Sequence, residues 1–231
     1  MHKTLFWHHQ ALPIKIERYE FPIEKLPIGA AQSELEKYIK DRSDADSNTW
    51  GYFPETKPDD TEYPATVSFV NAFERELLSK VDDLKDVNVQ LAFVRRATAE
   101  PVSNFGGFHI DASAGISHAW PEDVPKDMQV LRMLFNIGDQ PRKLEFYPHT
   151  VEQLRQKGII IPRDHYVMLN DLSQSLKTES IDIPPIEDNA LYGLTFVSTM
   201  VPHAGKTSGE GHFLISYGAY ITNQRVARAY N

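Results

Sequence analysis

Two histidines and one aspartate are the residues of this sequence with the clearest capacity for chemistry. His109 and Asp111 are separated by one residue, and His203 follows much later in the chain. Residues i and i+2 of a β-strand point to the same face, so a strand here would direct His109 and Asp111 toward one cation. Two imidazoles and one carboxylate on one face of an octahedron leave positions open, which suits an Fe(II) ion that also binds a chelating cosubstrate and O₂. The three residues therefore predict a non-haem iron site.

The His-x-Asp pair is weak evidence when it stands alone. With 9 histidines and 32 acidic residues among 231, about one such pair is expected by chance, and the sequence contains one. Its context is more specific. Gly106 and Gly107 precede His109 and allow the backbone to turn tightly beside the site. His203 stands at the end of an apolar, strand-like run and before a glycine-rich turn at 204–206. Order, spacing and strand context together support the metal site.

These residues resemble the pattern of the 2-oxoglutarate- and Fe(II)-dependent oxygenases, a family built on a double-stranded β-helix (a jelly-roll, cupin-like core). The family carries His-x-Asp/Glu and then a distal histidine near a glycine-rich turn, which correspond here to His109-Ile110-Asp111 and His203-Ala204-Gly205. The resemblance covers roughly residues 90–221. It implies Fe(II) held by His109, Asp111 and His203, with 2-oxoglutarate and O₂ as cosubstrates and ascorbate as a supporting reductant. It also implies hydroxylation, or a related oxidation, of a small-molecule, amino-acid-like or peptide substrate.

One position departs from the family pattern. The family often binds the distal carboxylate of 2-oxoglutarate with an arginine that follows the distal histidine, with a serine two residues further on. Ser216 is present here, but Leu214 occupies the arginine position. Arg132 is the expected substitute, because an arginine within an apolar strand is costly unless paired and its guanidinium matches a carboxylate. His212 is expected beside the cosubstrate or, alternatively, as a packing residue near it.

Three alternatives stay open. His149 is a rival distal ligand, although it directly precedes the capping-box pair Thr150 and Gln153 and so is typical of a residue that begins a helix. The missing arginine leaves room for a cupin-type metalloenzyme that does not use 2-oxoglutarate. The third alternative is a non-catalytic jelly-roll binding domain in which the histidines are incidental.

The elements that must position these residues change in character along the chain. Apolar residues at spacings of three and four predict helices at 31–41 and 66–84, with a turn-rich aromatic loop at 50–54 between them. A further helix is expected at 150–157, ended by Gly158. Strands are expected at 87–94, 128–137, 143–147, 159–161, 165–169, 190–201 and 212–221. The pattern favours a mainly β fold with flanking helices in a single domain, 1–231, with helical support to about residue 86 and a β core at about 87–221.

Composition excludes several classes of protein. The net charge of −8 and the absence of basic runs argue against nucleic acid as the main partner. The sequence contains no cysteine, which excludes disulfides and thiolate ligands. No apolar stretch approaches the about 20 residues of a membrane span, and the first residues lack a signal-peptide pattern. A cytoplasmic protein without a membrane partner is expected, and the oligomeric state is not predicted.

Overall fold

The computed structural model describes residues 14–41, 49–52, 63–81, 89–97, 109–110, 129–158, 167–168, 177–197, 201–206 and 212–221. Within these residues the helices are α1 (Ile28–Asp41), α2 (Pro64–Lys80) and α3 (Val151–Gln156), with a 3-10 turn η1 (Ile23–Lys25). The strands are β1 (Ile14–Glu20), β2 (Thr49–Tyr52), β3 (Val89–Ala97), β4 (His109–Ile110), β5 (Gln129–Asn136), β6 (Arg142–Phe146), β7 (Val167–Met168), β8 (Glu179–Ile183), β9 (Ala190–Val197), β10 (His203–Lys206) and β11 (His212–Ile221).

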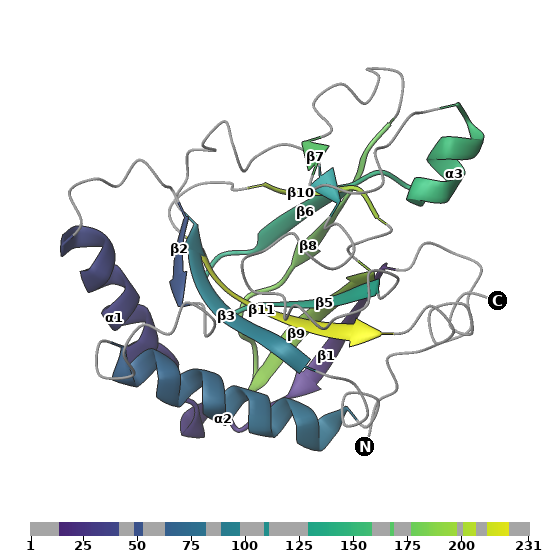
Figure 1. Ribbon diagram of the computed structural model, residues 1–231. Helices are drawn as coiled ribbons and strands as arrows, with labels where there is room; N and C mark the ends of the chain where they lie inside the picture. Colours follow the sequence, from purple (N-terminus) through teal and green to yellow (C-terminus); the bar gives the residue numbers. More distant parts are fainter. Residues whose placement is uncertain are drawn as a thin grey trace.

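The strands form two antiparallel sheets. The larger sheet has the order β1-β9-β5-β11-β3-β2, and the smaller sheet has the order β7-β4-β10-β6-β8. In Figure 1 the two sheets lie one above the other, with α2 beneath the larger sheet and α3 at one side of the smaller one. Consecutive strands repeatedly change sheet, as from β5 to β6 and from β9 to β10. Because of this alternation, neighbours within a sheet come from distant parts of the sequence.

The predicted mixture of flanking helices and a mainly antiparallel β core is confirmed. The second helix ends at Lys80, earlier than expected, because Val81 takes an extended conformation while its amide still bonds the Leu77 carbonyl at 3.0 Å. The strand expected at 159–161 lies outside the described residues. None of the described helices is long and apolar enough to cross a membrane.

The first third of the chain contributes two strands that were not predicted from the sequence, in addition to its helices. β1 pairs with β9 along its whole length, from Ile14 opposite Phe196 to Glu20 opposite Ala190. The segment expected as an aromatic loop forms β2, which pairs with β3. Both are edge strands, so the N-terminal region widens the larger sheet at both edges. The boundary between helical support and β core near residue 86 stays a prediction.

Two further strands differ from expectation. The expected strand at 190–201 ends at Val197, and His203 begins β10 instead of closing the preceding run. Gly205 therefore lies in a strand and not in a turn. β8 was not expected at all, because four of its five residues are exposed or half-buried and only Ile183 is buried. Its apolar pattern is too weak to be recognised without its partner β6.

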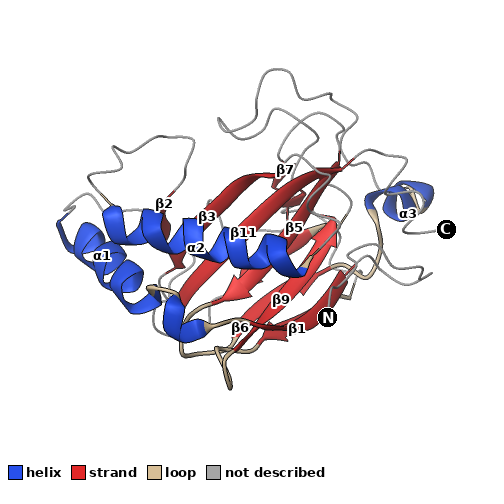
Figure 2. Cartoon of the chain, turned by 90° about the horizontal axis from the view of Figure 1, so that it is seen from below, coloured by secondary structure: helices blue, strands red, loops and turns tan. Residues whose placement is uncertain are grey.

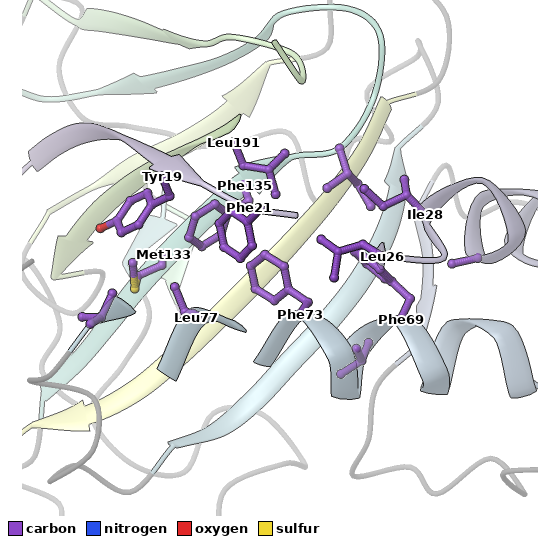
Figure 3. Close-up of a cluster of buried hydrophobic side chains, with 14 of the residues drawn as sticks. Tyr19, Phe21, Leu26, Ile28, Phe69, Phe73, Leu77, Met133, Phe135 and Leu191 are labelled. Atoms are coloured by element: carbon purple, nitrogen blue, oxygen red, sulfur yellow. The ribbon is translucent and has the colours of Figure 1, made fainter. Parts of the chain in front are cut away.

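Aromatic side chains hold the helices against the larger sheet. Phe135 of β5 lies 5.0 Å from Phe73 of α2 and 5.5 Å from Tyr19 of β1, measured between ring centroids. Phe21 stacks on Phe73 at 5.2 Å, and Figure 3 shows these rings gathered between sheet and helix. A Cβ on Gly193 would come within 2.7 Å of the Phe135 ring and 2.8 Å of the Tyr19 ring. Glycine is therefore required where β9 passes beneath this cluster.

A second apolar cluster lies between the two sheets. It joins Leu134, Leu194 and Phe196 of the larger sheet to Leu144, Phe146 and Ile183 of the smaller sheet. Figure 2 shows α1 and α2 on one side of the larger sheet, so this second cluster occupies its other side. On β5, Leu131, Met133 and Phe135 belong to the helix-facing cluster, whereas Leu134 belongs to the inter-sheet cluster. Successive strand residues alternate between faces, so Arg132 shares the inter-sheet face with Leu134.

Glu34 of α1 caps the first turn of α2. Its two carboxylate oxygens accept hydrogen bonds from the backbone amides of Ala65 and Thr66 at 3.1 and 2.7 Å, whereas the N-cap residue Tyr63 supplies no side-chain bond. These amides have no partner within a helix, and a carboxylate there also complements the helix dipole.

We expect Glu34→Ala to lower the free energy of unfolding by about 1–2 kcal/mol in urea denaturation. Ser33→Ala, a change at an exposed residue of the same helix, is the control and should lower the free energy of unfolding by at most about 0.5 kcal/mol. Equal decreases for the two variants would show that Glu34 does not cap α2.

Candidate metal centre

The two histidines predicted from the sequence are backbone partners. β4 and β10 are adjacent antiparallel strands, and their register places His203 directly opposite His109. On its other side His203 lies opposite Phe146 of β6. Residues directly opposite in an antiparallel pair have Cβ atoms about 4.5–5.5 Å apart on one face of the sheet. The fold therefore brings together two residues that are far apart in the sequence, at a spacing over which two imidazoles can share one cation.

The ring of His203 is buried and held in one orientation. The side chain is 6% exposed, and its Nδ1 lies 2.8 Å from the carbonyl oxygen of Val201. A carbonyl oxygen can only accept, so Nδ1–H is the donor and the neutral ring presents its lone pair at Nε2. The ring also packs edge-on against Phe196 of β9, with centroids 4.8 Å apart and planes at 70°. A backbone carbonyl that fixes the tautomer in this way is the usual companion of a metal-binding histidine.

The third predicted ligand, Asp111, directly follows β4 and lies outside the described residues. Among the residues that are described, no three His, Asp or Glu side chains gather to hold a metal ion. The structure thus brings His109 and His203 together, and the place of Asp111 in the triad stays a prediction.

Arg132 lies on the side of the larger sheet that faces His203. It is opposite Phe196 of β9 and opposite Gly218 of β11, and the Phe196 ring contacts the His203 ring. Arg132 is half-buried, whereas its strand neighbours Leu131 and Met133 are buried against the helices. Phe196 is therefore a shared neighbour, paired with Arg132 across the larger sheet and in ring contact with His203 between the sheets.

The other residues predicted to bind the cosubstrate lie on β11. Ser216 pairs with Leu134 of β5, and Leu214 pairs with Asn136. His212 begins the strand and pairs with Ala97 of β3. Leu214 is thus two residues nearer than Ser216 to the end of β5 that leads into β6. The contacts that Ser216 and His212 make with a cosubstrate stay predictions.

His149 has the structural role that its sequence context suggested. The backbone amide of Thr150 donates to Gln153 Oε1 at 2.8 Å, and the amide of Gln153 donates to Thr150 Oγ1 at 3.2 Å, so the predicted capping box is present. Gly158 follows with a φ of +82°, as expected of a helix stop. The Nε2 of His149 contacts the Lys157 ammonium at the other end of the same short helix. His149 is therefore tied to α3.

Two polar residues near the site stabilise the fold. Asn136 is fully buried; its amide nitrogen donates to the carbonyls of Gln140 and Ile183 at 2.7 and 3.0 Å, and its oxygen accepts from the Gly138 amide at 3.0 Å. It fastens the end of β5 to β8 in the other sheet. Burial, and secondarily the Glu145 carboxylate, raise the pKa of Tyr147, whose backbone amide bonds Pro202 and supports the segment before His203.

The residues that surround His203 were not among those expected from the sequence. Phe196 and Phe146 flank it from the two sheets, and Val201 supplies the carbonyl that orients its ring. Both phenylalanines belong to apolar strand patterns, so the sequence indicated their burial. It did not indicate their neighbour, because neighbours across sheets depend on register and packing.

Comparison with known proteins gives a shared fold and no sequence match. No family model matches the chain, and no curated protein matches it either. Among solved structures, the apo form of the Kdo hydroxylase KdoO, described as a non-haem Fe(II) α-ketoglutarate-dependent dioxygenase, has a TM-score of 0.57 at 12% identity. The alignment covers 98% of this chain and 89% of that one. The form of KdoO with succinate and Fe(III) has a TM-score of 0.57 at 13% identity, covering 94% and 82%.

A second protein has a similar fold. HygX from Streptomyces hygroscopicus, with nickel and 2-oxoglutarate bound, has a TM-score of 0.50 at 10% identity, covering 92% of this chain and 84% of that one. At such identities the likeness concerns the fold alone. The resemblance that the histidine motif suggested is confirmed at that level.

Proposed function

We propose that this chain is an Fe(II)- and 2-oxoglutarate-dependent oxygenase that hydroxylates, or otherwise oxidises, a small-molecule, amino-acid-like or peptide substrate. The observation that carries the proposal is the direct pairing of His109 with His203 across β4 and β10. The pairing occurs in a chain that shares its fold with a structure described as an Fe(II) α-ketoglutarate-dependent hydroxylase. The alternation of strands between two facing antiparallel sheets supports the double-stranded β-helix as the specific architecture.

The residues around His203 fit an iron ligand. The Val201 carbonyl holds Nδ1–H, which directs the lone pair of Nε2 away from the backbone. The Phe196 ring limits rotation of the imidazole, and burial excludes bulk water from this side of the ring. A ligand restrained in this way loses little freedom when it binds a metal. His109 and Asp111 complete the proposed triad.

The cosubstrate side of the site is proposed to involve Arg132, Ser216 and His212. Arg132 pairs with Phe196, whose ring contacts His203. At this position its guanidinium would attract the carboxylate groups of 2-oxoglutarate. When bound, Fe(II) would activate O₂, the oxidant, and 2-oxoglutarate would supply two electrons as it is converted to succinate and CO₂. The protein's part is to hold both against an apolar interior, where charged hydrogen bonds are stronger than in water. A cytoplasmic location and a single domain over 1–231 belong to the same proposal.

Succinate release tests the proposed function directly. We expect the purified protein, supplied with Fe(II), ascorbate, O₂ and 2-oxoglutarate, to form succinate slowly without substrate and faster once a substrate is supplied. The control is the same mixture without Fe(II), in which succinate should not form. A protein that binds Fe(II), Mn(II) or Co(II) but not 2-oxoglutarate would instead be a cupin-type metalloenzyme. A protein that binds none of these metals would be a binding domain.

A further inference from the structure

Arg142, the first residue of β6, carries a deeply buried charge for which the described residues supply no counter-ion. It is 7% exposed, and its Nη1 has no hydrogen-bond partner in the part of the chain that the structure describes. Burial lowers the pKa of Arg142 to about 10, and among the described residues no carboxylate offsets this effect. A guanidinium in an apolar interior is costly unless an anion accompanies it. The arrangement therefore calls for an anionic partner that the described residues do not supply.

The side chain of Arg142 belongs to the face of the smaller sheet that carries the metal-site histidine. Arg142, Leu144 and Phe146 are the buried residues of β6, alternating with half-buried ones, and the last two pack against the larger sheet. Phe146 is directly opposite His203, so both face the space between the sheets. Four residues along β6 correspond to about 13 Å. An arginine side chain and a metal-bound dicarboxylate, placed end to end, cover such an interval.

Arg142 and Arg132 lie at different distances from His203 along the space between the two sheets. Arg142 pairs with Ile183 of β8, whose carbonyl accepts a hydrogen bond from Asn136, so Arg142 lies at the end of the β5–β6 turn. Arg132 precedes Asn136 by four residues on β5 and is opposite Phe196, beside His203. Arg132 is therefore close to the metal level, and Arg142 is at the far end. Apolar residues of the inter-sheet cluster lie between these levels.

We propose that Arg142 binds the distal carboxylate of 2-oxoglutarate, the role left open by Leu214, while Arg132 serves the end of the cosubstrate nearer the metal. The inference rests on the proposed function. A carboxylate would accept two parallel N–H bonds from the planar guanidinium of Arg142, which is the strongest pairing available to either group. The methylene groups of the cosubstrate would lie over the apolar side chains between the two depths. The buried charge of Arg142 would then make the site bind a dicarboxylate more tightly than a monocarboxylate.

The test compares two keto acids that differ only at the distal end. 2-Oxoglutarate has a carboxylate there, and 2-oxopentanoate has a methyl group on a chain of the same length. Dissociation constants are measured by calorimetry on Mn(II)-loaded full-length protein, for wild type, Arg142→Met and Arg132→Leu. We expect wild type to prefer 2-oxoglutarate by about 10- to 100-fold, the value of a hydrogen-bonded charge pair. In Arg142→Met this preference should fall to near unity, whereas Arg132→Leu should weaken both keto acids and keep the preference.

Thermal unfolding of the same variants without keto acid separates binding from structural support. A counter-ion-free guanidinium should not stabilise the ligand-free protein, so Arg142→Met should unfold at the wild-type temperature or above it. If Arg142→Met does not fold, Arg142→Gln, which removes the charge but keeps donors, takes its place with the same expected loss of preference. A preference that survives removal of the Arg142 charge overturns this inference and leaves the proposed function intact. A metal-loaded wild type that binds neither keto acid overturns both.

Discussion

We expect His203→Ala to abolish tight metal binding and succinate formation together. His203 is the buried, tautomer-fixed histidine opposite His109, and its removal leaves two proposed ligands for a metal that needs three from the protein. Loss of a residue that merely orients a ligand costs about 10- to 100-fold in metal affinity, so loss of the ligand itself should cost more than 100-fold. Isothermal titration with Co(II) or Mn(II) measures the affinity, and a succinate assay with Fe(II) measures the turnover.

His149→Ala is the matched control for this prediction. It removes a histidine that contacts Lys157, the residue after α3, and the metal affinity should remain within about twofold of wild type, the spread expected of a residue without contact to the metal. Both variants are checked for folding by circular dichroism, because His203→Ala also removes a ring contact with Phe196. If His149→Ala lost the metal and His203→Ala kept it, the distal ligand would be His149 and the proposed triad would be wrong.

The largest effect on stability is expected from Phe135→Ala. Phe135 is fully buried and its ring contacts Tyr19, Phe21 and Phe73, so it joins β1, β5 and α2. Removing a buried phenylalanine side chain costs about 3–5 kcal/mol, from lost burial and from the cavity left behind. We expect a decrease of that size in the free energy of unfolding, a large fraction of the about 5–15 kcal/mol that stabilises a typical domain.

Guanidinium denaturation measures this decrease, with Ile16→Ala as the control. Ile16 is a large apolar residue on β1 that is 38% exposed, so its truncation should cost no more than about 1 kcal/mol. Equal effects of the two changes would mean that the aromatic cluster does not hold the helices to the sheet. Metal affinity of the folded fraction of Phe135→Ala should be unchanged, because Phe135 faces α2 and not the inter-sheet interior.

Local patterns were sufficient to predict most of the elements. The capping box at Thr150 and Gln153 and the stop at Gly158 were predicted and are observed, because a cap depends on residues within one turn of helix. β11 occupies 212–221 as expected. β8 and β2 could not be predicted, since β8 is mostly exposed or half-buried and β2 is only four residues long with a central glycine, and they pair with β6 and β3 from other parts of the sequence.

The sequence by itself determined which side chains could bind iron, because the chemistry of histidine and aspartate is independent of the fold. It also determined that a β core would carry them, since alternation of apolar residues is local. Only the tertiary structure decided that His203 lies opposite His109, because register between distant strands depends on the packing of both sheets. It also distinguished Arg142 from Arg132. Arg132 lies in the apolar strand β5 and Arg142 in the charged strand β6, and the position of each between the sheets is a property of the assembled fold that cannot be read from either segment.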